Sequence, residues 1–441
     1  MDRYFQLKEK QTSVKVEFMA GVTTFLTMGY IIFVNPLVLS PTGMDKEALI
    51  AVTCIVSAIA TIIVGVFAKA PIAMAPGMGL NAFFAYLVSS GKMDWQTALG
   101  VVFLSGLLFL ALTLLGLRKK IVEAIPASLI SAIAVGIGLF ITFIGLVKLG
   151  IVVKDEHTLV AAGPLTGTVL IGLFGLLVML YFEMKKVVGS LILGILASST
   201  LAIAVGKTEL PTQVISLHLN IEAISFKLNI LGALKWGFFG SIFTLMFMDM
   251  FDSVGTLVAC CHQANMVDEN GKIKGLDRLL GIDAIATMIG AVFGTSTTTA
   301  YIESAAGIEQ GGRSGLTSIV TGVLFLLALL FVPIVGIVPG YATAPALIMV
   351  GLFMMKEVKQ IDFSNLGEAF PAFIIIVMIA LSYSISTGLA FGFISFTIIK
   401  SVSGKAKDIK PAMWIIAILS ALFLTLDRLT GIIEWLKNIW Q

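Results

Sequence analysis

The stretch GTSTTTAYIESAAGIEQGGRSG, residues 294–315, lies between two long apolar segments and is rich in glycine and hydroxyl residues. A membrane-spanning helix needs ~20 mostly apolar residues, and the apolar part here, residues 300–308, has about half that number. Glycine and small residues allow close backbone contact and loosen a helix. The stretch therefore predicts a discontinuous span, in which an extended run at Ser296–Thr299 meets a half-helix that starts near Tyr301.

A break of this kind is expected to adjoin a ligand site. Irregular backbone at membrane depth is tolerated only where protein buries it or water lines it. The N-terminus of a half-helix also offers free N–H groups and a positive dipole end to a polar ligand.

The composition is that of a polytopic membrane protein. Of the 441 residues, 58% are hydrophobic and 12% are charged, whereas a soluble domain carries roughly 25% charged residues. The polar segment 1–17 precedes an apolar run that is too long for a signal peptide. No cofactor and no nucleic-acid partner is expected. No metal site or disulfide framework is expected either, because the cysteines and histidines lack the required spacing: Cys54, Cys260, Cys261, His157, His218 and His262.

The apolar segments predict an all-α membrane protein with fourteen spans. We place them at about 18–39, 48–68, 75–90, 96–116, 125–147, 164–181, 187–206, 233–258, 278–293, 300–311, 314–335, 342–355, 366–384 and 386–400. A further apolar segment, 412–426, either crosses the membrane or lies along its surface. The predicted parts are a cytoplasmic N-terminus (1–17), a seven-span repeat (18–206), a connecting loop (207–232), a second seven-span repeat (233–403) and a C-terminal segment (404–441).

The distribution of basic residues predicts the orientation. With the N-terminus in the cytoplasm, most of the 29 Lys and Arg residues fall on the cytoplasmic side. This is the bias that the positive-inside rule describes. It supports the span count too, since one missed span would reverse the side of every later loop.

A weak internal repeat indicates that the two halves are related. IPASLISAIAVGIGLFI (125–141) resembles TAPALIMVGLFMM (343–355), and Pro126 matches Pro345 at a separation of 219 residues. The same shift carries APGMGLNAFF (75–84) onto the start of the stretch at 294. Seven spans separate the halves, an odd number, so they face opposite ways. Short, interrupted segments at matching positions of inverted halves are the sequence signature of a transporter site.

Carboxylates within the predicted spans are the first candidates for function. Each costs at least ~2.5–3.5 kcal/mol on insertion scales, and such residues are functional by default. Asp249 and Asp252 share one helix face, and we expect Asp252 to lie opposite Glu303 at mid-membrane. One carboxylate can accept hydrogen bonds from the N–H donors of a flat heterocycle, and another can load and release a coupling proton. Candidates for proton coupling are Asp252, Glu303 and Asp249. Structural roles stay open for Asp249 and for Asp283.

Four further residues are candidates for substrate binding. Asn81 is the expected third polar group, beside glycines whose backbone a ligand can approach closely. Phe83 and Tyr301 can stack on an aromatic ring, although aromatic residues at these spacings more often pack in a core. Thr24, in the first span, is expected to face the same cavity.

Four stretches resemble the azaguanine-type purine permeases, a branch of the nucleobase–cation symporter-2, or xanthine/uracil permease, superfamily. They are APGMGLNAFFAYLV (75–88), MFDSVGTLVA (250–259), the stretch at 294–315 and LSYSISTGLAFGFI (381–394). The resemblance extends from about Val16 to Ser403. It implies fourteen spans in two inverted repeats, with a core domain (spans 1–4 and 8–11), a gate domain (spans 5–7 and 12–14) and substrate between them.

The resemblance also implies an activity and a membrane location. It implies proton-coupled uptake of adenine, guanine or hypoxanthine across the plasma membrane, with strands and half-helices in spans 3 and 10. The uracil and xanthine branches are commonly homodimeric, and a homodimer is an expectation for this chain on that ground alone.

Two departures from the superfamily pattern limit what can be carried over. Asp252-Ser253-Val254-Gly255 stands where the wider superfamily has Glu-His-x-Gly, and Glu303-Ser304 stands where it has Glu-Asn. Aspartate is shorter than glutamate, and serine replaces both histidine and asparagine. The substrate geometry of uracil transporters is therefore not transferred to this chain.

Two other functions compete with purine transport. The first is transport of an anion such as sulfate or bicarbonate on the same architecture. Acidic residues suit an N–H-bearing base better than an anion, and such anion transporters commonly carry an added soluble domain, whereas about 40 residues follow the last predicted span here. The second is an intramembrane aspartyl protease, which the sequence disfavours because it contains no GxGD signature.

Overall fold

The computed structural model describes residues 2–116, 125–210, 213–216, 219–266, 273, 275–422 and 424–425. The chain divides into two compact units, one formed by Met1–Leu114 and Ile141–Met349 and the other by Leu115–Phe140 and Val350–Gln441. Of the predicted segment 412–426, residues 423 and 426 lie outside the described residues, as does His218. The division into two seven-span repeats and into core and gate domains stays a prediction.

The first unit holds most of the helices and all four strands. Its helices are α1 (Asp2–Phe5), α2 (Val14–Met28), α3 (Ile31–Leu39), α4 (Lys46–Ile63), α5 (Met78–Ser89), α6 (Trp95–Leu114), α9 (Gly167–Met184), α10 (Ser190–Ala204), α11 (Ile230–Ala233), α12 (Phe239–Gln263), α13 (Leu276–Phe293), α14 (Ser304–Glu309), α15 (Gly315–Ala328) and α16 (Val332–Ile337). Two helices, α8 (Ala127–Leu149) and α17 (Gly340–Met354), each contribute residues to both units.

Side-chain caps fix where several of these helices begin. The Ser13 hydroxyl accepts a hydrogen bond from the Val16 N–H before α2. The Asp45 carboxylate does the same for the Ala48 N–H before α4. Such oxygens satisfy N–H groups that have no partner within the first turn. Short polar residues thus mark where these helices begin.

Eight helical segments in the described part of the chain are long and apolar enough to cross a membrane. They are Val14–Thr42, Lys46–Ala68, Trp95–Leu114, Ala127–Leu149, Gly167–Met184, Phe239–Gln263, Gly315–Ile337 and Gly340–Gln360. Shorter apolar helices include Met78–Ser89, Ser190–Ala204 and Leu366–Leu381. The chain is therefore a multi-pass, predominantly helical membrane protein, and the number of fourteen spans stays a prediction.

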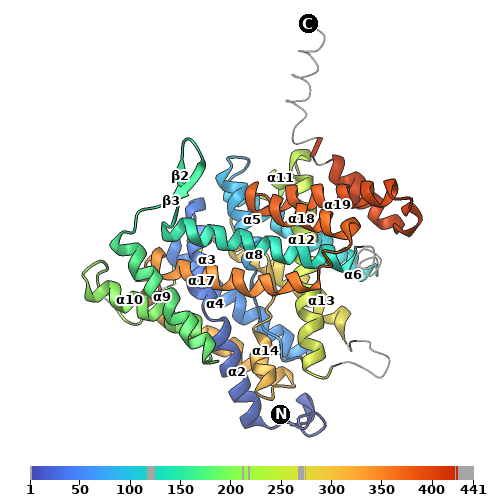
Figure 1. Ribbon diagram of the computed structural model, residues 1–441. Coiled ribbons are helices and arrows are strands. Elements are labelled where there is room, and N and C mark those ends of the chain that lie inside the picture. The colour runs from blue at the N-terminus through green and yellow to red at the C-terminus, as the bar shows by residue number, and fades with distance from the viewer. Residues whose placement is uncertain are drawn as a thin grey trace. The chain divides into compact units, whose positions relative to one another are not determined.

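The strands form two separate antiparallel pairs. β2 (Val152–Asp155) and β3 (Leu159–Ala162) form a hairpin that precedes α9 in the chain (Figure 1). β1 (Met74–Pro76) pairs with β4 (Thr298–Ala300), far apart in the sequence, and every residue of both strands is buried. The β1–β4 pair, together with the helices that follow its two strands, positions the candidate site.

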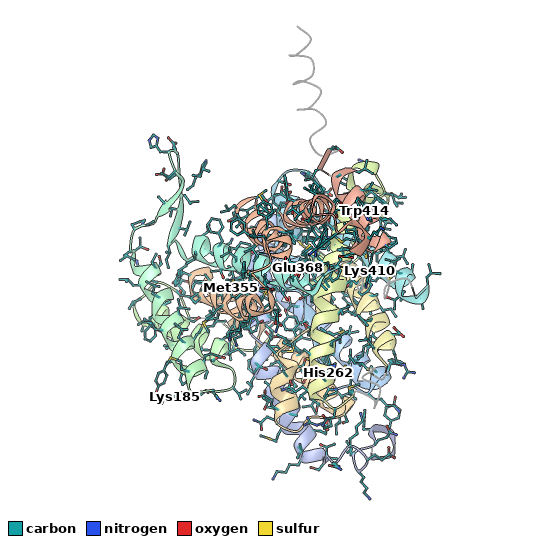
Figure 2. The ribbon with its side chains drawn as sticks, turned by 45° about the vertical axis from the view of Figure 1, so that its right-hand side comes forward. Lys185, His262, Met355, Glu368, Lys410 and Trp414 are labelled. Atoms are coloured by element: carbon teal, nitrogen blue, oxygen red, sulfur yellow. The ribbon has the colours of Figure 1, made fainter. Side chains whose placement is uncertain are left out.

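The second unit is built around α18 (Leu366–Leu381) and α19 (Ile385–Val402). A Cβ atom added at Gly388 of α19 would lie 2.8 Å from the Ile379 backbone nitrogen, so glycine permits this close packing. Glu368, labelled in Figure 2, accepts a hydrogen bond from Ser128 at 2.9 Å and forms a salt bridge with Lys400 at 3.7 Å. Polar contacts thus tie the start of α8 and the end of α19 to α18.

Candidate functional site

The pairing of β1 with β4 is the centre of the candidate site. The Cα partners are Met74 with Ala300, Ala75 with Thr299 and Pro76 with Thr298. The ladder continues past both strands, because the Gly77 N–H donates to the Thr297 carbonyl at 2.9 Å. Within a membrane protein, extended backbone must find hydrogen-bond partners inside the protein. Each strand here supplies partners to the other.

Threonine side chains satisfy the outer edges of this strand pair. Thr61 of α4 accepts from the Met74 N–H at 2.9 Å and donates to the Met74 carbonyl at 3.0 Å. On the other edge, Thr287 of α13 accepts from the Thr298 N–H at 3.3 Å and lies 3.0 Å from the Thr298 carbonyl, while its proton is donated to the nearer acceptor, Asp249 Oδ2, at 2.8 Å. The two-stranded sheet therefore has no exposed edge at these positions, although it is only three residues long.

A helix begins just after each strand. Gly77 is the N-cap of α5, and a Cβ atom there would lie 2.6 Å from Thr299 Cγ2, so the close approach of the two strands requires glycine. Glu303 is the N-cap of α14, a helix of 6 residues. Figure 1 shows α14 beside α2, near the N-terminus. The extended run predicted at Ser296–Thr299 corresponds to β4, which begins at Thr298. The helix predicted from Tyr301 corresponds to α14, which begins at Ser304.

Glu303 is half-buried, and its carboxylate accepts a hydrogen bond from Tyr30, which was not among the residues predicted for the site. The Tyr30 hydroxyl donates to Glu303 Oε1 at 2.5 Å. Tyr30 lies between α2 and α3 and is 1% exposed. One turn earlier, the Thr27 hydroxyl reaches the Glu303 backbone carbonyl at 3.4 Å. The one sequence signal for Tyr30 was a tyrosine inside an apolar span, where a buried hydroxyl needs a partner.

Asp252 lies on α12 close to Glu303, as the sequence predicted. Its carboxylate is hydrogen-bonded by the Thr299 side chain and repels the carboxylate of Glu303. The neighbouring Ser253 shares a hydrogen bond with Thr299 at 3.0 Å. A residue of β4 therefore connects α12 to the strand pair, and two half-buried acids face the same region.

Tyr301 and Phe83 are both buried, but their contacts differ. The Tyr301 hydroxyl donates to the Pro76 backbone carbonyl at 2.5 Å, which joins the end of β4 to the end of β1. The Phe83 ring stacks on Tyr86 with centroids 6.4 Å apart. The polar end of Tyr301 is thus already engaged, and the stacking of either ring on a ligand stays a prediction.

Asn81 belongs to a buried polar network beside the strands. Its amide donates to Asn35 Oδ1 at 2.7 Å, and its carbonyl oxygen accepts from the Ser296 hydroxyl. Asn35 in turn donates to Thr53 at 2.6 Å and to Thr295 at 3.2 Å. The structure therefore uses both ends of the Asn81 amide to connect α5, α3 and the chain before β4.

Thr24 and Asp249 have different surroundings. The Thr24 hydroxyl is buried and has no hydrogen-bond partner among the described residues, and it packs where Gly307 of α14 lies against α2. Asp249 accepts from Thr287 at 2.8 Å and interacts with the charge of Asp283, so it faces α13. Asp249 and Asp252 are three residues apart on α12, yet their hydrogen-bond partners belong to different elements.

Metal-ligand chemistry is not apparent at this site. Among the residues that the structure describes, no group of three or more His, Cys, Asp and Glu side chains could hold a metal ion. His262 is exposed near the end of α12 (Figure 2). The chemical character of the site is that of carboxylates and hydroxyls beside buried backbone.

The comparisons with known proteins cover nearly the whole chain. A model described as Permease family, for xanthine and uracil permeases, matches residues 15–391. The chain is 42% identical to the guanine/hypoxanthine permease PbuO of Bacillus subtilis, covering 94% of this chain and 98% of that one. It is 39% identical to the adenine permease AdeP of Escherichia coli, covering 95% and 94%.

A solved structure shows the same fold at low sequence identity. The transmembrane domain of the cyanobacterial bicarbonate transporter BicA superposes with a TM-score of 0.66 at 16% identity, covering 83% of this chain and 95% of that one. This likeness bears on the fold alone.

Proposed function

The chain belongs to the xanthine/uracil permease family, and from this membership we propose that it takes up purine nucleobases: adenine, guanine or hypoxanthine. It is a transporter and not an enzyme. The family match confirms the resemblance seen in the sequence. The relatives named as adenine and guanine/hypoxanthine permeases support the choice of purines.

The single observation that carries the proposal is the placement of Asp252 and Glu303. Both acids are half-buried, repel one another and lie next to the paired strands. A purine offers ring and exocyclic N–H groups in one plane, and carboxylates are strong acceptors for such donors. Asn81, Thr24, Phe83 and Tyr301 are proposed as further residues that contact the substrate.

We propose that the coupling ion is a proton. Two carboxylates held close together in a low-dielectric region repel one another, and this repulsion favours the binding of a proton to one of them. Asp252 and Glu303 are the first candidates for this role, and Asp249 is the third. No cofactor is involved in this proposal.

The strand pair supports a transporter architecture of two inverted repeats. Thr61 accepts from the Met74 N–H on one side as Thr287 accepts from the Thr298 N–H on the other, and the strands run antiparallel. We propose that spans 3 and 10 are interrupted at these strands and that fourteen spans form core and gate domains. The N-terminus is proposed to lie in the cytoplasm and the protein in the plasma membrane, with a homodimer as its assembly.

Anion transport is the alternative on the same fold. The structural likeness to BicA raises it, and the two acids argue against it, because carboxylates repel an anion. The test is uptake of labelled adenine, guanine, hypoxanthine, sulfate and bicarbonate into liposomes that contain the purified protein. We expect uptake of a purine and none of the anions above empty liposomes. Uptake of sulfate or bicarbonate without purine uptake would reject the proposal.

A further inference from the structure

Tyr30 holds one oxygen of the carboxylate that the proposed function assigns to substrate. Its hydroxyl lies 2.5 Å from Glu303 Oε1, and its side chain is 1% exposed. A phenol donating to a carboxylate makes a short, charge-assisted hydrogen bond, which is stronger than a bond between neutral groups. This contact is therefore a specific polar interaction and not packing alone.

The chain around Tyr30 is arranged to deliver the hydroxyl to this place. Tyr30 follows Gly29 at the junction where α2 ends and α3 begins. Thr27, one turn earlier, contacts the backbone carbonyl of the same glutamate. The Thr27 hydroxyl lies nearer to carbonyls of its own helix, at 2.9 Å, so Tyr30 is the residue at the end of α2 that holds the Glu303 side chain.

Tyr30 also lies within electrostatic range of the other site groups. Its hydroxyl interacts with the charges of Glu303 and Asp252, and with Tyr301. A carboxylate has about four acceptor directions on its two oxygens. With directions taken by the Tyr30 hydroxyl and by the Glu303 backbone N–H, the carboxylate is held in one orientation and keeps further acceptor directions for N–H donors.

We propose that Tyr30 is a positioning residue of the substrate site, which orients the Glu303 carboxylate toward the N–H groups of the purine. The inference rests on the proposed function. An unrestrained glutamate side chain loses rotamer freedom when it binds a ligand, and a carboxylate held in place beforehand avoids that loss. Substrate affinity is therefore the property that Tyr30 controls.

The variant Tyr30→Phe tests this role, because it removes the hydroxyl and keeps the ring. The matched control is Tyr341→Phe, which removes a hydroxyl that bonds instead to Thr208 at 3.2 Å. For each purified protein we would measure the Kd of labelled hypoxanthine, adenine and guanine, the thermal unfolding temperature, and the KM and maximal rate of uptake in liposomes.

Tyr30→Phe is expected to raise the Kd and KM for the purine roughly threefold to tenfold, because binding must then order a free glutamate side chain. Its maximal rate should match that of Tyr341→Phe, and its unfolding temperature should be lower, because the Glu303 carboxylate loses a buried hydrogen-bond donor. A Kd within twofold of the unchanged protein overturns the inference, as does a lower maximal rate or unfolding temperature with an unchanged KM. If the unchanged protein binds no purine, the proposed function itself fails, and the role of Tyr30 fails with it.

Discussion

Thr61 and Thr287 each accept a hydrogen bond from a strand N–H on opposite edges of the β1–β4 pair, that of Met74 in one case and of Thr298 in the other. The Thr61 hydroxyl donates to the Met74 carbonyl, whereas the Thr287 hydroxyl donates to Asp249 Oδ2 at 2.8 Å and lies 3.0 Å from the Thr298 carbonyl. A buried N–H or C=O without a partner costs about 1–3 kcal/mol. These two threonines therefore stabilise extended backbone that a helical membrane protein could not otherwise bury.

Thr61→Val should destabilise the protein by roughly 1–3 kcal/mol, because valine keeps the shape of threonine but leaves the Met74 backbone groups unpaired. Thr61→Ser should restore most of the loss, since it restores the hydroxyl. The measurement is thermal unfolding in detergent. Ser57→Ala is the control on the same helix, because that buried hydroxyl has no hydrogen-bond partner in the part of the chain that the structure describes. Equal unfolding temperatures for Thr61→Val and Ser57→Ala would contradict the account.

Glu17 makes a comparable contribution at the start of α15. Its carboxylate is fully buried and accepts from the Thr317 hydroxyl at 2.6 Å, the Thr317 N–H at 3.2 Å and the Arg313 N–H at 2.9 Å. Glu17→Gln places an amide N–H₂ among these donors and should cost roughly 2 kcal/mol or more. Glu309→Gln is the control, because Glu309 is exposed and bonds only to Gln263 among the hydrogen bonds described. An unchanged unfolding temperature for Glu17→Gln would show that α15 does not depend on this cap.

Asn81 offers a test of the buried polar network. Asn81→Asp replaces the amide that donates to Asn35 Oδ1 with an oxygen, so two acceptors would face each other. We expect loss of stability by roughly 1–3 kcal/mol and loss of uptake. If Asn81 acts only by touching substrate, Asn81→Asp should change substrate affinity and leave the unfolding temperature unchanged. Thermal unfolding measured beside purine binding separates these results.

Glu303 and Asp252 are expected to have different roles in transport. Glu303→Gln replaces one acceptor oxygen with a donor group at nearly unchanged shape, and should weaken purine binding by about 2 kcal/mol or more. We assign Asp252 to substrate and to proton coupling, so Asp252→Asn should retain some binding but lose accumulation of purine against a gradient. Binding to each purified variant, measured beside counterflow in liposomes, checks both statements. Parent-like binding by Glu303→Gln, or accumulation by Asp252→Asn, would show that the assignment is wrong.

The sequence predicted an extended run followed by a helix within residues 294–315, and β4 and α14 lie there, while the interruption of a membrane span at this place stays a prediction. It also predicted that Asp252 lies near Glu303. A short apolar run with hydroxyl residues cannot form an ordinary span, and acids inside spans are rare. The internal repeat stays a prediction: Pro126 and Pro345 are 219 residues apart, whereas the strand starts Met74 and Thr298 are 224 apart.

Other features depend on contacts between distant segments, which one sequence does not reveal. Tyr30 reaches Glu303 across 273 residues, and nothing in its neighbourhood indicates that partner. Asn81 was expected to face the ligand, and its amide contacts Asn35 and Ser296. The spacing of Asp249 and Asp252 predicts that they share one helix face. In the structure Asp249 contacts α13 and Asp252 contacts β4.

The most direct test of proton-coupled purine transport is accumulation driven by an imposed pH gradient. Liposomes containing the protein, alkaline inside and acidic outside, would be given labelled hypoxanthine, adenine or guanine with and without a protonophore, and with a sodium gradient at equal pH as the control. We predict that at least one purine accumulates above its external concentration under the pH gradient, that the protonophore abolishes this accumulation, and that a sodium gradient alone produces none. Accumulation driven by sodium and insensitive to the protonophore would contradict the account.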